Sequence, residues 1–113
     1  MEETSLGMVR IAPSVLATIV SLTASSVGGV AEMSAVSRPP SRVLHNPNAG
    51  SAPGVTLHVR NGEISADVYI VAEAETNLKT LGHTVQQQVI EALDKMVSMP
   101  TGQVNVYIED VTE

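Results

Sequence analysis

Hydrophobic residues in the first third of the chain recur at the spacing of a helix. A helix is predicted over about residues 13–26, because Pro13 suits its first turn and Gly28 with Gly29 ends it. Its apolar positions, three or four residues apart, are Val15, Leu16, Ile19 and Leu22. Residues 8–11 form a short extended run, since the residue that precedes a proline disfavours helical backbone. Residues 30–33 fit a further short strand.

Apolar and polar residues alternate in two runs on either side of Asn61-Gly62. The runs cover residues 55–60 and 64–70, and a period of two is typical of a strand with one buried face. Asn-Gly favours the two-residue type I′ turn, because both of its central residues have positive φ angles. The pattern therefore predicts a β-hairpin.

A second amphipathic helix follows the hairpin. Asn77 is placed to cap it, and Pro100 requires it to end by Met99. Its apolar positions, again three or four residues apart, are Leu78, Leu81, Val85, Val89, Leu93 and Met96. The polar residues Gln86, Gln87, Glu91, Asp94 and Lys95 lie on its other face. Residues 104–109 alternate again and are predicted as the last strand.

The element order β-α-(β)-β-β-α-β predicts an α+β fold. Two amphipathic helices and strands with one apolar face each favour a two-layer sandwich, in which both helices pack on one face of a small mixed sheet of three or four strands. A chain of 113 residues supports one hydrophobic core, so residues 1–113 are expected to form a single domain.

Residues 34–54 are predicted to be a mobile loop within that domain. The segment contains four of the chain's six prolines, together with Asn and Gly residues. It also carries Arg38 and Arg42 and no acidic residue, which makes it a positive patch that suits an acidic partner or anionic lipid headgroups.

Charge and composition exclude several classes of function. The net charge of −6 repels phosphate backbones, and Tyr69 and Tyr107 are the only aromatic residues, so we expect no nucleic-acid partner. The chain has no cysteine, which excludes disulfides and thiolate chemistry. Residues 11–31 carry no charge but contain proline, glycine and many hydroxyl residues, so we expect neither a membrane span nor a cleaved signal and interpret the protein as cytoplasmic.

Candidate chemistry is sparse. His45, His58 and His83 are scattered without the spacing of metal ligands, and Glu73 with Glu75 at a strand end fits a solvated pair better than a catalytic one. Motifs of a nucleophile elbow or a phosphate loop are not found. We therefore expect no enzymatic activity, no cofactor and no metal.

One helix face is unusual. By periodicity the outward residues of the first helix are Ser14, Thr18, Ser21 and Ser25, flanked by Ala17 and Ala24. Surface helices ordinarily carry charged residues there, and small side chains let another backbone approach closely. Either this face is a plain solvated surface, or it is covered by a second copy, a partner or the loop 34–54.

The order of these motifs resembles the alkaline shock protein family of bacterial envelope stress proteins. The motifs, mostly structural and specific by their order, are Gly7-x-x-x-Ile11-Ala12-Pro13, Gly29-Val30-x-x-Met33-Ser34, Val55 to Val59, Asn61-Gly62, Asp67-Val68-Tyr69-Ile70-Val71 and Val104-Asn105-Val106-x-Ile108. They cover nearly the whole chain outside the 34–54 insertion. That insertion is longer and richer in proline than is usual for the family, and the first helix has Ser and Thr where members usually have charged residues.

The resemblance implies a small non-enzymatic cytoplasmic protein linked to cell-envelope homeostasis. In some members a membrane-anchored protein partner holds it at the inner membrane surface, and members self-associate into homo-oligomers. We therefore expect a scaffold whose interaction residues are Ser14, Thr18, Ser21, Ser25, Arg38 and Arg42. Two alternatives stay open: a small enzyme subunit with a site between protomers, using His58, His83 or Glu73, and an RNA-binding module.

Overall fold

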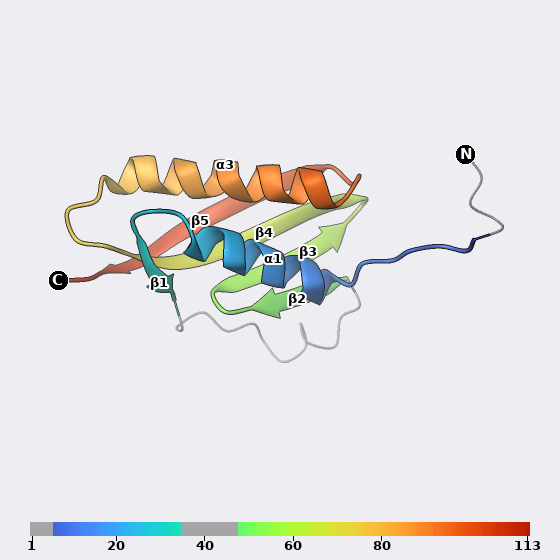
Figure 1. The fold of residues 1–113 in the computed structure, drawn as a ribbon, viewed down its shortest axis with the longest axis horizontal. Coiled ribbons are helices and arrows are strands. Elements are labelled where there is room, and N and C mark those ends of the chain that lie inside the picture. The colour runs from blue at the N-terminus through green and yellow to red at the C-terminus, as the bar shows by residue number, and fades with distance from the viewer. Residues whose placement is uncertain (1–5, 35–47) are drawn as a thin grey trace.

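A five-stranded sheet is covered on one face by two helices (Figure 1). This computed structural model describes residues 6–34 and 48–113. The elements in chain order are α1 (Pro13–Ser25), β1 (Val30–Met33), β2 (Ala49–Ala52), β3 (Val55–Arg60), β4 (Glu63–Ala72), α3 (Leu78–Met96) and β5 (Thr101–Val111). The predicted α+β fold with both helices on one side is confirmed.

Strand β4 is the centre of the sheet. Strand β5 runs parallel to it from Ile64 to Ala72, and all other pairings are antiparallel, so the sheet is mixed as predicted. Because a strand has two edges, β3 and β1 share the opposite edge of β4 end to end, with β3 along residues 63–68 and β1 along residues 70–72. Strand β2 pairs with β3, which leaves β5 as the far edge of the sheet.

The core lies between the sheet and the helices. From β4 the side chains of Ile64, Ala66, Val68 and Ile70 are almost completely buried. Helix α3 adds its predicted apolar stripe, of which Leu81, Val85, Val89 and Leu93 are buried. The Asn77 side chain accepts a hydrogen bond from the Thr80 N–H at 3.0 Å, as its N-cap position predicts.

Helix α1 is rotated relative to the periodicity-based prediction. Ser21, predicted to face outward, is only 7% exposed, and its hydroxyl donates to the Pro53 carbonyl at 2.7 Å. Ala17 and Ala24 are fully buried, whereas Leu22, predicted to face the core, is 65% exposed. Ala17, Ser21 and Ala24 therefore lie on the inner face of this helix, together with Leu16 and Val20.

The reason is a close approach between α1 and β2. A Cβ atom at Gly50 would lie 2.5 Å from the carbonyl carbon of Pro13, so only glycine fits there. A helix this close to a strand needs small side chains between the two backbones. Pro53, which accepts from Ser21, belongs to the predicted loop 34–54, so part of that segment covers the small-residue face.

Four other expectations are wrong. Residues 49–52 form β2 instead of loop, and with β1 the sheet has five strands instead of three or four. Residues 8–11 are extended but pair with no strand of the described chain, so the fold begins with α1. The last strand spans Thr101–Val111, which is longer than the predicted 104–109. Positions 35–47 of the predicted loop lie outside the described residues.

Candidate functional site

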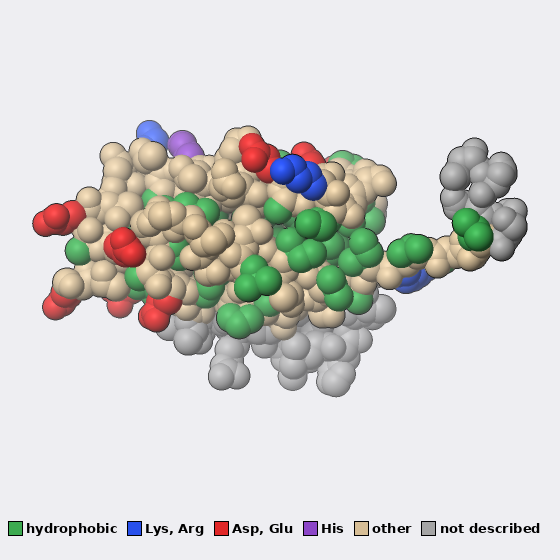
Figure 2. Space-filling view, viewed as in Figure 1, with side chains coloured by type: hydrophobic (Ala, Val, Ile, Leu, Met, Phe, Trp, Pro, Cys, Tyr) green, Lys and Arg blue, Asp and Glu red, His purple; other side chains and the backbone are tan. Residues whose placement is uncertain are grey.

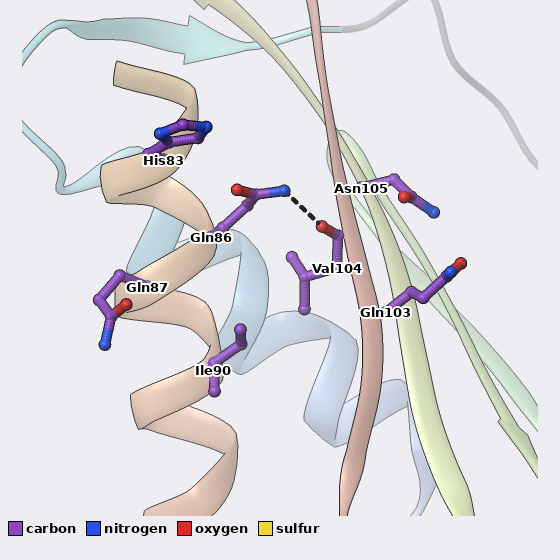
Figure 3. A pocket seen from close by; sticks show the side chains of 7 residues that line it. All are labelled: His83, Gln86, Gln87, Ile90, Gln103, Val104 and Asn105. Atoms are coloured by element: carbon purple, nitrogen blue, oxygen red, sulfur yellow. Dashed lines mark hydrogen bonds between the residues drawn. The ribbon is translucent and has the colours of Figure 1, made fainter. Parts of the chain in front are cut away.

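The outer edge of β5 is the longest open strand edge of the described chain. β5 has eleven residues and pairs with β4 along its inner edge only. Helix α3 lies beside the strand, and a groove of about 540 Å³ runs between them (Figure 3). An open edge presents unpaired backbone N–H and C=O groups, to which another extended chain binds.

Seven residues line the groove, and the side chains of Gln103 and Asn105 point away from α3 (Figure 3). His83, Gln86, Gln87 and Ile90 project from α3, while Gln103, Val104 and Asn105 come from β5. The Gln86 side chain reaches across and donates to the Val104 carbonyl at 3.0 Å (Figure 3). This bond satisfies one backbone acceptor of the open edge, so Gln86 protects the strand where the helix passes over it.

The sheet face opposite the helices joins β4 to β5 through side chains. The Asn105 amide donates to the Asp67 carboxylate at 3.0 Å. The rings of Tyr69 and Tyr107 stack with centroids 4.7 Å apart and planes 15° apart. Partial burial and then the neighbouring Asp67 carboxylate raise the pKa of Tyr69 above its ordinary value of 10.0. Both contacts fix β5 on β4 and leave the outer edge of β5 free.

The far end of β5 is acidic. Glu109 and Asp110 are exposed near the end of the strand. The Thr112 N–H donates to the Ala72 carbonyl at 2.9 Å, which places this end beside the exposed Glu73. Acidic side chains also gather at this end in the space-filling view (Figure 2). An extended partner that follows β5 to this end meets a negative potential.

The predicted interaction residues are not brought together at this edge. Ser14, Thr18 and Ser25 are exposed on α1, and the hydroxyls of Thr18 and Ser25 donate to carbonyls of their own helix. Ser21 is buried against Pro53 and is not accessible to a partner. Arg38 and Arg42 lie outside the described residues.

The residues of the alternative enzyme site lie apart. His83 lines the α3–β5 groove, and His58 lines a different groove at the β3–β4 turn. Glu73 lines neither of these two, and His45 lies outside the described residues. Within residues 6–34 and 48–113, no three His, Asp or Glu side chains are close enough to hold a metal ion. In the same part of the chain, no helix has the length and apolar character to cross a membrane.

Sequence reasoning missed the role of Gln86. It assigned this residue to the polar face of the second helix, where a neighbouring Gln87 gives an identical signal. The helix period puts Gln86 next to the buried Val85 and Val89, at the border of the apolar stripe. That border position is the one feature that separates it from Gln87, which is exposed.

Comparison with known proteins identifies the family. A model of the alkaline shock protein 23 family, described as having a cell envelope-related function, matches residues 1–113. The chain therefore belongs to this family, as the order of its motifs indicated. YqhY of Bacillus subtilis (strain 168), an uncharacterized protein, is 31% identical over 112 residues, which span 95% of this chain and 78% of YqhY.

Solved structures of the MamM CTD have a similar fold. One variant gives a TM-score of 0.52 at 15% identity and covers 88% of this chain and 95% of its own. A nickel form gives a TM-score of 0.52 at 14% identity and covers 88% of this chain and 98% of its own. At these identities the similarity shows the fold alone, and it agrees with the α+β architecture.

Proposed function

Since the chain belongs to the alkaline shock protein family, we propose that it is a non-catalytic interaction module of the cell envelope. It acts as a self-associating scaffold at the cytoplasmic face of the membrane, where a membrane-anchored protein partner recruits it. The observation that carries the proposal is the open outer edge of β5, which ends among acidic side chains. The partner therefore contributes an extended, basic segment that pairs with this edge.

The chemistry of the groove supports binding over catalysis. Beside His83, the polar side chains that α3 contributes are the amides of Gln86 and Gln87, which donate and accept hydrogen bonds but do not transfer protons near neutral pH. Gln86 holds the Val104 carbonyl and leaves the rest of the strand edge for a partner. A partner strand gains affinity from backbone hydrogen bonds and specificity from its alternate side chains.

Membrane co-sedimentation tests this proposal. Purified protein is mixed at physiological salt with inside-out membrane vesicles from the bacterium whose genome encodes it. Two parallel samples contain the same vesicles after protease treatment and liposomes made from the extracted lipids. We expect binding to the native vesicles and little to the other two. Equal binding to liposomes, or no binding to native vesicles, contradicts recruitment by a protein partner.

A charge-reversed pair of variants tests the position of the binding edge. Glu109→Lys with Asp110→Lys is expected to weaken co-sedimentation at least tenfold, because it opposes a basic segment. The matched control is Glu91→Lys with Asp94→Lys, which changes the net charge equally on exposed positions of α3. Equal loss in both variants means that the effect comes from net charge and that the β5 edge is not the docking site.

A further inference from the structure

An apolar arm precedes α1 at the end of the molecule opposite the acidic one. Residues 6–12 are extended and project away from the body (Figure 1). Leu6, Met8 and Val9 are 91%, 77% and 93% exposed. Three large apolar side chains almost fully in water on one short segment are costly, unless the segment binds an apolar surface.

An apolar groove lies at the root of this arm. Its volume is about 460 Å³, and its walls are the arm residues 9–13, the start of α1, the end of β3 and the segment 96–99. Its apolar side chains include Leu16, Val59 and Met99. Apolar side chains gather at this end of the surface, next to the arm (Figure 2). Residues 6–8 lead away from the groove that their own chain forms (Figure 1), so no described residue occupies either the arm or the groove.

We propose that residues 6–8 of one copy dock in this groove of a second copy, while the second copy's arm docks in the groove of the first. Each chain has one apolar arm and one apolar groove side by side, so a two-fold pair occupies both without leaving an open end. This inference rests on the self-association part of the proposed function and names the surface that carries it.

Charge supports a second copy as the occupant. The chain carries a net charge of −6, so two copies repel each other in most orientations. The groove lining contains Arg10 and no acidic residue, and residues 6–9 are uncharged. Association through this end keeps the acidic ends, with Glu109 and Asp110, far apart and leaves the β5 edges free.

The size of the surface is sufficient for a dimer. Full burial of a Leu, Met or Val side chain removes roughly 100 Å² of apolar surface from water. Two exchanged arms and the groove walls that they cover therefore bury on the order of 1,000 Å², which is near the lower limit of specific interfaces.

Disulfide trapping between two variants tests the exchange, because the chain has no cysteine of its own. Met8→Cys protein is mixed with size-tagged Ser98→Cys protein and oxidised gently; Ser98 is exposed and lines the groove. We expect a disulfide-linked heterodimer of the two variants. In the control, tagged Glu109→Cys protein replaces the Ser98→Cys protein. The proposal is overturned if Ser98→Cys gives no more heterodimer than this control.

A variant that carries both Met8→Cys and Ser98→Cys shows whether the arm docks in the groove of a second copy or in the groove of its own chain. Exchange gives linked dimers, whereas an arm that occupies its own groove gives an internal disulfide in a monomer. An internal disulfide without dimers also overturns the proposal.

Native mass spectrometry over a range of concentrations measures the same interface without cysteines. We expect a dimer that Met8→Asp with Val9→Asp weakens at least tenfold, while Leu22→Asp on the exposed face of α1 leaves it unchanged. None of these three residues is buried in the monomer, so thermal unfolding of the monomer controls for folding. A wild-type monomer at all concentrations, or a dimer that the arm variant leaves intact, overturns the proposal. The arm variant is expected to bind native membrane vesicles as the wild type does, because that binding uses β5. Failure of the arm exchange can therefore be told apart from failure of the proposed function.

Discussion

Helices α1 and α3 cover the same face of the sheet in different ways. Helix α3 buries one large aliphatic side chain in each turn, from Leu81 to Leu93, and exposes a polar face. Helix α1 buries Ala17, Ser21 and Ala24 beside Leu16 and Val20, and exposes Leu22. The helix with the regular stripe lies over β5, while the helix with the small residues lies against β2.

The difference shows that side-chain size decides which face of a helix is buried when two backbones come close. At Gly50 there is no room for a Cβ atom, so the contact selects Ala and Ser on α1. Under α3, aliphatic side chains fill the space next to the sheet, and hydrophobicity predicts the inner face. Helix α3 is therefore expected to be sensitive to shortening of its buried residues, and α1 to enlargement of its buried residues.

Shortening a core residue of α3 is expected to have the largest effect. Leu93→Ala leaves a cavity at a fully buried position and lowers the free energy of unfolding by about 3 kcal/mol. Urea denaturation followed by circular dichroism measures it. Met96→Ala, on the same helix but half exposed, is the control and changes stability by about 0.5 kcal/mol or less. Equal effects at the two positions contradict the assigned inner face of α3.

Enlarging a core residue of α1 is expected to come second. Ala24→Leu forces the helix away from the strands beneath it and costs about 2 kcal/mol, again by urea denaturation. The control Leu22→Ala shortens a residue that periodicity assigned to the core, and its cost is expected to stay below about 0.5 kcal/mol. If Leu22→Ala is the more damaging of the two, the observed rotation of α1 is wrong.

Removing the hydroxyl of Ser21 is expected to have a smaller effect. Ser21→Ala deletes the bond to the Pro53 carbonyl but keeps the small volume, so unfolding becomes easier by about 1 kcal/mol. Ser25→Ala removes a hydroxyl that bonds within α1 on the exposed side and serves as the matched control. Thermal unfolding of both proteins side by side gives the comparison, and no difference between them means that the Pro53 contact contributes nothing.

The helix starts give the smallest expected effect. Asn77 caps α3, whereas Ala12 at the same position of α1 makes no side-chain cap. Ala12→Ser is expected to stabilise the protein by about 0.5 kcal/mol, because its hydroxyl accepts from an N–H of the first turn. Asn77→Ala is expected to lower the melting temperature, whereas Ala12→Ser raises it. If both substitutions shift the melting temperature in the same direction, capping is not the cause.

The parts of the fold with strong local signals were predictable. The hairpin at Asn61-Gly62 and the stripe of α3 follow from backbone preference and period, and both are present. Strand β2, with the residues Ala-Gly-Ser-Ala, has no β-branched residue that indicates a strand. Its conformation comes from pairing with β3 and from contact with α1, neither of which is local in sequence.

The candidate site was less predictable than the fold. The expected interaction residues lie on α1 and in the loop 34–54, whereas the open edge belongs to β5 because of its parallel pairing with β4. Residues 8–11 gave a strand-like pattern and became an exposed arm, because no strand of the described chain lies next to them. Such outcomes depend on the arrangement of distant segments, which periodicity does not contain.

The parallel pairing of β4 and β5 also affects how the chain folds during synthesis. Ile64 pairs with Thr101 and Ala72 with Val111, so each contact of this ladder joins residues nearly forty positions apart. While a ribosome is still making this region, β4 has no neighbour on that side and α3 has no strand beneath it. Long-range pairing of this kind slows folding and prolongs the exposure of apolar surface and unpaired strand edges. Nascent chains arrested before residue 101 are therefore the ones that we expect to engage chaperones.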